Sequence, residues 1–471
     1  MATNHIQIKN VNQGGIADSD YLGGVGSVSE IVGINIHDES GIMKLNQKLT
    51  EIDDSSSPVD ALCKAIVPCS NGSTYFFGTN GKVWKRTSGG TWSLLQTCAP
   101  AAGAAGVLSA WEYQGYIYYA MQSRLGRMAI FGETFTDSWA TFTNTDADYH
   151  PMYEVNQVLY IGDANYISQV DAGTFSANAL DIKTPLRVSA LGKIGTDLLI
   201  GTYVSSNVVG TEIFRWNTWS DSYQVSDEIP EVGVNAFLST DNRIVVSCGT
   251  KGNLYFFNGT QLDEYKQIKG TWGNSSNKAI VNPNAVFNFH GLPLFGLSQQ
   301  TGTGVNLGIY SFGRTNANYP YVLSLEYPIS TGNLTGIQIG AIAGNGDSFY
   351  VSWYDADGSG SYGIDYLDLT AKQTSGYITT RVSLFDRIVT STYGVMSAAY
   401  RSLPENTSIK FYANRNHAGF VEKTDVVTDT ERLLVHTESD AGEANTFQSK
   451  FELRSSANTS PEVELFDIPV T

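Results

Sequence analysis

The chain has 471 residues, is rich in glycine (47) and in aromatic residues (12%), and carries a formal net charge of −17. Because an acidic surface repels the phosphate backbone, we expect no sequence-specific binding to nucleic acid. No stretch approaches the roughly 18 consecutive apolar residues of a membrane span, the first residues lack the features of a signal peptide, and four cysteines make no disulfide framework.

Residues 1–60 do not follow the pattern of the rest of the chain. They contain a Gly- and Ser-rich stretch from Gly14, an apolar–polar alternation from Gly41 to Leu49, and a polar linker from Asp53 to Pro58. We expect an extended N-terminal arm with one or two strands. One of these strands would supply the outer strand of the last repeat described below and so close a ring.

A pair of short apolar strands, joined by a Gly-rich or polar turn, recurs seven times between residues 61 and 382. The first copies read YFFG–KVWKR, IYYA–RMAIFG and LYIG–YISQVD, and the last reads FYVSW–GIDYLDL. A period of about 40–50 residues built from short strands predicts a seven-bladed β-propeller. Equivalent points of successive copies lie 39 to 56 residues apart, at Phe77, Tyr119, Ile161, Ile200, Ser247, Phe295 and Val351.

Residues 383–471 depart from this repeat. Four strand-like segments begin at Thr407, Glu431, Thr446 and Pro461 and are separated by polar turns. They predict a small C-terminal β-sandwich of jelly-roll type. The chain is therefore predicted to be all-β, with an arm (1–60), a seven-bladed propeller (61–382) and a β-sandwich (383–471).

No motif of a catalytic or nucleotide-binding site stands out. The sequence lacks a Walker A loop and the GxSxG and HExxH motifs. Propellers host glycoside hydrolases that use paired carboxylates, but candidates such as Asp163, Asp227 and Glu264 do not single out a pair. We therefore expect a non-enzymatic protein with no catalytic or cofactor-binding residues.

One loop is a candidate metal site. Asp355, Asp357 and Asp365 lie in the segment DADGSGSYGID, and carboxylate oxygens are ligands that Ca²⁺ prefers. The loop lacks the acidic residue that closes an EF-hand loop, and Asp and Gly are also favoured in a plain hairpin turn. Calcium binding and a simple turn are the two interpretations.

Two segments rich in aromatic residues are candidates for ligand binding. Trp216, Trp219 and Tyr223 lie in FRWNTWSDSY, and Trp272 lies in KGTWGNSS. Trp beside Asn, Asp and Ser suits a surface that stacks on a sugar ring and bonds its hydroxyls. Alternatively, these side chains pack between blades.

Both ends of the chain carry motifs that occur together in one class of protein. The arm reads GGIADSDYLGG and then VGINIHDESGIMKLNQKLTE, and the chain ends in TFQSKFELRSSANTSPEVELFDIPV. This style resembles the virion proteins of tailed bacteriophages.

The resemblance implies a structural component of a phage tail or head–tail connector, acting as a ring, hub, nozzle or fibre attachment. It also implies a homo-oligomer that assembles with other virion proteins, is made in the host cytoplasm and resides in the virion. An alternative is a propeller at the host-proximal tip that binds surface glycans or a receptor. A propeller glycoside hydrolase is a further alternative.

Overall fold

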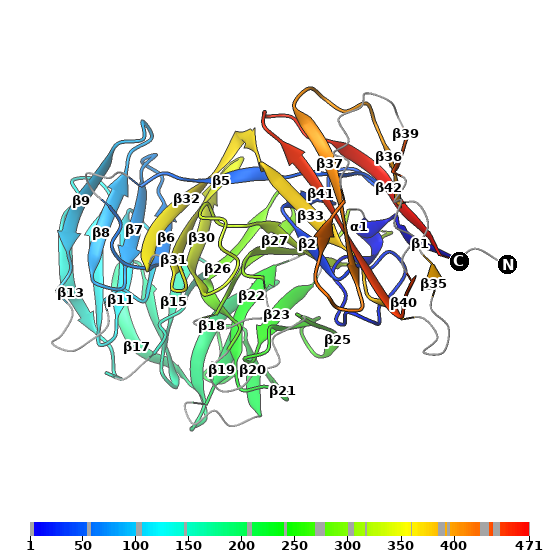
Figure 1. Ribbon diagram of the computed structural model, residues 1–471. Helices are drawn as coiled ribbons and strands as arrows, with labels where there is room; N and C mark the ends of the chain where they lie inside the picture. Colours follow the sequence, from blue (N-terminus) through cyan, green and yellow to red (C-terminus); the bar gives the residue numbers. More distant parts are fainter. Residues whose placement is uncertain are drawn as a thin grey trace. The chain divides into compact units, whose positions relative to one another are not determined.

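The structure is a computed structural model that describes residues 4–53, 58–99, 106–145, 148–204, 210–239, 243–268, 278–299, 306–315, 318–358, 360–384, 391–392, 396–423, 433–436 and 443–470. These residues form an all-β protein with one short helix, α1 (Val11–Gly14) (Figure 1). No helix among them has the length and apolar character that crossing a membrane requires.

The chain divides into two compact units. Glu51–Leu307 and Asn333–Tyr366 form one, which we call the propeller unit, and Met1–Thr50, Gly308–Gly332 and Leu367–Thr471 form the other, the terminal unit. Each unit contains residues from more than one of the segments 1–60, 61–382 and 383–471 that the sequence predicts as domains. The division into these three domains stays a prediction.

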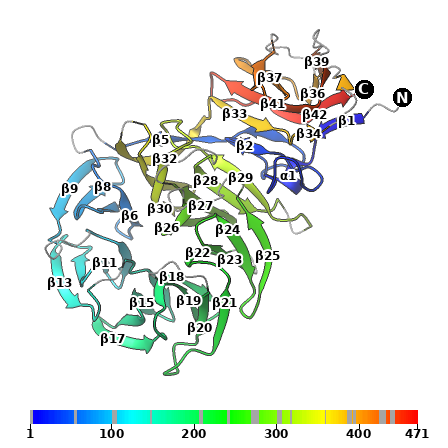
Figure 2. The same cartoon turned by 60° about the horizontal axis from the view of Figure 1, so that its bottom comes forward.

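The propeller unit is built mainly from repeated four-stranded antiparallel sheets, arranged one after another around a centre (Figure 2), and the first five are each made of consecutive strands. This repetition is the architecture of a β-propeller. The first five sheets are formed by β6 (Cys63–Pro68), β7 (Thr74–Gly78), β8 (Lys82–Arg86) and β9 (Trp92–Thr97); β10 (Ser109–Tyr113), β11 (Tyr116–Met121), β12 (Arg124–Ala129) and β13 (Phe135–Thr141); β14 (Met152–Val155), β15 (Val158–Asp163), β16 (Tyr166–Asp171) and β17 (Thr174–Asp181); β18 (Arg187–Ile194), β19 (Asp197–Tyr203), β20 (Thr211–Trp216) and β21 (Val225–Ile229); and β22 (Val234–Ser239), β23 (Ile244–Cys248), β24 (Asn253–Phe257) and β25 (Leu262–Gln267).

Two further sets of strands continue the series. The hairpin of β26 (Ile280–Phe289) and β27 (Leu292–Ser298) comes next. The last sheet has the order β30-β31-β32-β5, from β30 (Ile337–Asn345), β31 (Ser348–Asp355), β32 (Ser361–Lys372) and β5 (Gln47–Glu51). The strand β5 comes from the N-terminal arm, and directly after it the N–H of Ile52 donates to the carbonyl oxygen of Ile364 (2.9 Å).

The second strand of each of the first five sheets explains the repeated sequence. Successive residues of a strand point to opposite faces, so the adjacent pair Phe76 and Phe77 packs in two directions. Phe77 stacks against Tyr119 of the second sheet, with ring centroids 5.7 Å apart, whereas Phe76 packs in a cluster with Tyr350 of the last sheet. Because both faces are covered, these strands read as continuous apolar runs.

The first strands of the sheets follow one another and return to the start. Contacts run from β6 through β10, β14, β18, β22, β26 and β30 back to β6. Serine hydroxyls join neighbouring sheets, because Ser109 Oγ donates to the carbonyl oxygen of His150 and Ser352 Oγ accepts the N–H of Cys63 (2.9 Å). The second of these bonds joins the last sheet to the first.

Aromatic and cationic side chains strengthen this closing contact. The rings of Phe76 and Tyr350 meet edge to face, with centroids 5.5 Å apart. Arg86 donates a hydrogen bond from Nη1 to the hydroxyl of Tyr350 (3.1 Å), and its guanidinium lies 5.7 Å from the ring centroid of Tyr366. The cluster buries apolar surface of both sheets, which is the main source of stabilisation at such a contact.

The terminal unit contains two larger sheets and a short strand pair. An aromatic core joins the larger sheets, because Phe466 of one stacks on Phe451 of the other with ring centroids 4.0 Å apart. One sheet contains β3 (Ile34–Asn35), β4 (Met43–Leu45), β42 (Glu462–Val470), β36 (Met396–Tyr400), β39 (Leu433–His436) and β1 (Asn4–Ile8); the other contains β28 (Gly308–Gly313), β29 (Val322–Tyr327), β2 (Glu30–Val32), β33 (Ser375–Thr379), β41 (Thr446–Ser455), β37 (Thr407–Arg415), β38 (Val421–Glu422) and β34 (Ser383–Leu384); the pair is β35 (Ser391–Thr392) with β40 (Glu443–Ala444).

We expect Phe76→Ala to lower the free energy of unfolding by about 3–5 kcal/mol, because it removes a fully buried ring from the closing contact. Urea denaturation followed by tryptophan fluorescence measures this loss. The control is Phe131→Ala, since Phe131 is 81% exposed and its loss should change stability by less than about 0.5 kcal/mol. Equal effects of the two substitutions would show that the closing contact contributes little.

Candidate functional site

A cavity of about 360 Å³ lies in the propeller unit where the first strands converge. We call it the wide cavity. All seven first strands, β6, β10, β14, β18, β22, β26 and β30, contribute to its wall. Ligand sites in proteins commonly have volumes of about 300–1,000 Å³ and mostly apolar walls. The wide cavity has this size and lining, and its largest side chains are Trp111, Met152, Tyr153, Phe237 and Phe287.

A second, narrower space adjoins the wide cavity, and the two share Pro151, Pro283 and Asn284 in their walls. Residues at the beginning of the first strands line the narrow space, and residues further along the same strands line the wide cavity. The narrow space has a volume of about 10 Å³, which is room for about one water molecule. We refer to the two adjoining spaces together as the channel, with a narrow polar end and a wide apolar end.

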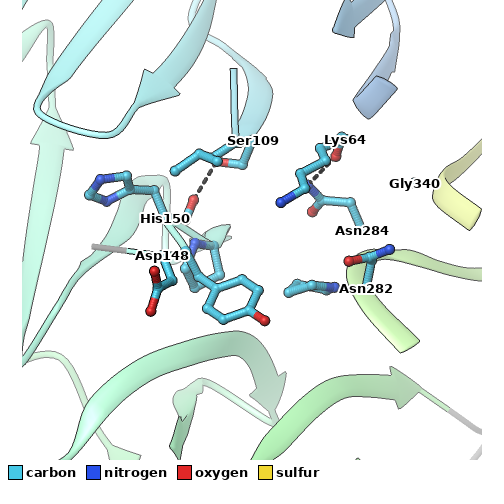
Figure 3. A pocket seen from close by; sticks show the side chains of 11 residues that line it. Lys64, Ser109, Asp148, His150, Asn282, Asn284 and Gly340 are labelled. Atoms are coloured by element: carbon cyan, nitrogen blue, oxygen red, sulfur yellow. Dashed lines mark hydrogen bonds between the residues drawn. The ribbon is translucent and has the colours of Figure 1, made fainter. Parts of the chain in front are cut away.

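The polar character of the narrow space comes from side chains on several strands, and Figure 3 shows Lys64 reaching toward the middle of them. Burial lowers the pKa of the Lys64 ammonium, and the charge of Asp148 acts in the opposite direction. Among the described residues, none forms a hydrogen bond or ion pair with this ammonium. Lys64 is therefore a partly buried cation without a direct partner.

Other polar groups of the narrow space hold the strands together. Asn284 donates from Nδ2 to the carbonyl oxygen of Lys64 (2.7 Å; Figure 3). Asn282 donates in the same way to the carbonyl oxygen of Ile339. His150 is buried and stacks on Phe142, and each of its ring nitrogens faces a backbone carbonyl, at 2.6 and 3.0 Å. These side chains are engaged in the architecture of the ring, and the Lys64 ammonium is not.

The aromatic residues named from the sequence lie in different environments. Trp216 is buried and donates from Nε1 to the carbonyl oxygen of Ser220 (2.7 Å). Tyr223 packs on Phe214, with ring centroids 4.5 Å apart. Trp219 is 83% exposed, and Trp272 lies outside the described residues. Sugar binding by these residues stays a prediction, and Trp219 is the one shown with its indole open to solvent.

The three aspartates of the candidate calcium loop do not converge. Asp355 accepts hydrogen bonds from Asn333 Nδ2 (2.8 Å) and from the N–H of Gly358 (2.7 Å). Asp365 lies about four residues further along the pair of strands and accepts one from the indole N–H of Trp353 (2.8 Å). Asp357 lies in the intervening turn. The described part of the chain shows no group of three His, Cys, Asp or Glu side chains placed to hold a metal ion, and calcium binding stays a prediction.

None of the channel residues was named from the sequence. Most lie in the leading strand of each repeat, whose apolar character predicts a buried strand and no more. One signal was available, because Lys64 is the only charged residue in the otherwise apolar segment KAIVPC. A lone lysine at the start of such a strand indicates a cation held inside the ring.

No family model matches the sequence, and no curated protein matches it. Solved structures do resemble the fold. The extracellular domain of the hybrid two-component system BT3049 from B. thetaiotaomicron matches with a TM-score of 0.51 at 10% identity, over 93% of this chain and 61% of that one. YCF48 from Cyanidioschyzon merolae matches with a TM-score of 0.46 at 10% identity, over 68% of this chain and 98% of that one. Chaetomium thermophilum Raptor matches with a TM-score of 0.47 at 9% identity, over 69% of this chain and 30% of that one.

The similarity to the BT3049 domain supports a fold of β-propeller type and extends no further. Identity of about 10% shows the fold alone, and this chain spans less than two thirds of the length of BT3049 and Raptor chains. The solved structures named above are not phage proteins, so the virion resemblance gains no support from them.

A second group of buried polar side chains lies in the terminal unit. Glu326 accepts hydrogen bonds from Asn46 Nδ2 (2.6 Å) and Ser311 Oγ (2.9 Å), and His37 Nε2 lies 3.3 Å from its Oε1. Burial raises the pKa of Glu326 to about 8 and lowers the pKa of His37 to about 4. Both side chains are therefore neutral near pH 7. Since Ser311 is completely buried, we assign this group to stability rather than to nucleophilic catalysis.

This group makes stability depend on pH. The folded state keeps a proton on Glu326 that the unfolded state has already released, so stability falls as the pH rises until it passes about 8. His37 acts in the opposite direction, but only between about pH 4 and 6.5. From pH 6.5 to 8 we expect wild type to lose about 2 kcal/mol more free energy of unfolding than Glu326→Gln, measured by urea denaturation at each pH. Glu405→Gln, at an exposed position, should keep the wild-type slope, and the same slope in Glu326→Gln would contradict the prediction.

Proposed function

We propose that this protein is a non-catalytic binding protein whose propeller takes up an apolar ligand in its central channel. The observation that carries this proposal is the wide cavity of about 360 Å³, whose mainly apolar wall is drawn from all seven first strands. Its aromatic side chains include Trp111 and Tyr153, which lie against each other with ring centroids 5.5 Å apart. A wall held by a closed ring is already organised for binding, and such preorganisation favours affinity.

The architecture that we propose for this role is a seven-bladed β-propeller accompanied by a C-terminal β-sandwich. Two observations support it. The contacts between first strands return from β30 to β6 after seven strands. In the terminal unit, the stacked rings of Phe451 and Phe466 join two sheets face to face, as in a sandwich.

The neutral fluorophore N-phenyl-1-naphthylamine tests the proposed function, because its emission rises in an apolar site. We expect saturable binding to the wild-type protein. Ala343→Trp should weaken this binding at least about tenfold, because Ala343 lines the wide cavity and an indole would fill it. The matched control is Ala177→Trp, on the exposed outer strand β17 of the same unit.

Circular dichroism of both variants confirms that they fold. If the wild type does not bind the fluorophore, or if Ala343→Trp binds it as strongly as the wild type does, the channel is not the binding site.

The exposed indole of Trp219 favours glycan binding as a second candidate function. The turn that carries it is ordered by Asn217, whose Oδ1 accepts the N–H groups of Trp219 (2.9 Å) and Ser220 (3.0 Å). A fixed, solvent-facing indole can stack on a sugar ring.

We expect Trp219→Ala to abolish binding to an oligosaccharide array while it changes the free energy of unfolding by less than about 0.5 kcal/mol. Phe131→Ala removes a similarly exposed aromatic side chain elsewhere and should leave the array signal unchanged. Binding that survives Trp219→Ala would exclude this residue as the sugar contact.

The virion role, its homo-oligomeric assembly and its location in the phage particle rest on the sequence motifs alone and stay predictions. A rigid ring with a ligand channel is compatible with a structural component or a host-proximal tip. It is equally compatible with a binding protein of another origin, and the channel proposal does not depend on the choice.

A further inference from the structure

We infer that the ligand of the channel is an apolar monocarboxylate, whose head group is bound by the ammonium of Lys64 at the narrow end. This inference rests on the proposed function and adds the chemical class and the orientation of the ligand. It is carried by the Lys64 ammonium at the narrow end, the apolar wall of the wide cavity and the arrangement of the few charges along the channel.

The Lys64 ammonium is the cation of the narrow space, and no described residue forms a hydrogen bond or ion pair with it. Lys64 is half-buried, and a cation with part of its hydration removed is stabilised by an anion or by several acceptors. Asp148 is the nearby opposite charge, but its Oδ2 already accepts a hydrogen bond from the hydroxyl of Tyr203 (2.7 Å), and its side chain is exposed. A ligand oxygen in the narrow space would give Lys64 the direct partner that the described residues do not provide.

The charges along the channel set the direction in which such a ligand lies. Among the side chains that line the two spaces, the charged ones are Lys64 and Asp148 at the narrow end and Glu112 in the wide cavity. Glu112 accepts the N–H of Ser70 (3.1 Å). Lys64 is the one cation among these three side chains, so a carboxylate that pairs with its ammonium places its head group in the narrow space, with Asp148 at the same end offsetting part of the attraction.

The sizes of the two spaces select the head group. The narrow space admits about one water-sized group, which matches a single carboxylate oxygen and not a phosphate with three free oxygens. The apolar body of the ligand then lies along Trp111, Tyr153 and Phe287 in the wide cavity. A flexible aliphatic chain or an aromatic ring system fits this description.

Displacement of N-phenyl-1-naphthylamine by decanoate and by decan-1-ol tests the inference, because the two probes share one apolar chain and differ in the charged head group. In the wild type, decanoate should displace the fluorophore at a concentration about tenfold lower than decan-1-ol, as expected for one hydrogen bond to a charged group. Lys64→Gln should remove this preference, and each probe is compared with the affinity that this variant itself shows for the fluorophore. Lys9→Gln, an exposed lysine of the terminal unit, should keep it.

The outcomes separate this inference from the proposed function. If the fluorophore binds but decanoate is no better than decan-1-ol, or is equally preferred by Lys64→Gln, the carboxylate inference is overturned and the apolar channel stands. If the fluorophore does not bind the wild type, the proposed function itself fails. Should Lys64→Gln not fold, Lys64→Met keeps the length of the side chain without its charge, and the comparison of the two probes on the wild type decides by itself.

Discussion

The contact between the first and last sheets of the propeller unit is the constraint on which the rest of that unit depends. Each strand of the channel wall belongs to a different sheet, so the distance across the channel is fixed only if every sheet keeps its neighbours. Phe76, Tyr350 and Arg86 hold the one junction that chain connectivity does not provide. A ligand that touches strands on both sides of this junction would stabilise the closed ring by binding to it alone.

The repeated architecture could be predicted because one physical requirement recurs in each sheet. A strand covered on both faces needs apolar side chains at consecutive positions, and a pair such as Phe76 and Phe77 or Tyr118 and Tyr119 meets this need. The outer strands alternate because one face meets solvent, as β21 does. The apolar or alternating pattern of each short strand depends only on neighbouring residues in the sequence. The repeated strands can therefore be recognised from the sequence.

The candidate site could not be predicted in the same way because its contacts are not local. Asn284 bonds to the backbone of Lys64 across 220 residues of sequence, and no motif links the two. Sequence patterns instead draw attention to clusters of neighbouring residues, such as the aspartates at positions 355 to 365. In the structure, Asp355 and Asp365 bond to different partners on the protein. The grouping of β28 and β29 with the chain ends was equally invisible, because their apolar pattern is that of any other repeat.

The position of β5 beside β32 has a consequence for how the protein is made. Asp53, just after β5, accepts the N–H of Ile364, which lies 311 residues further along the chain. At a synthesis rate of about 5–20 residues per second, the ribosome delivers that partner roughly 15–60 s after the arm has emerged. During this interval β5 lacks the strand beside which it lies in the fold, and an unpaired strand is open to association with other chains. Completion of the fold therefore belongs to the last stage of synthesis, and a product that stops before the last repeat lacks β32, the strand beside which β5 lies.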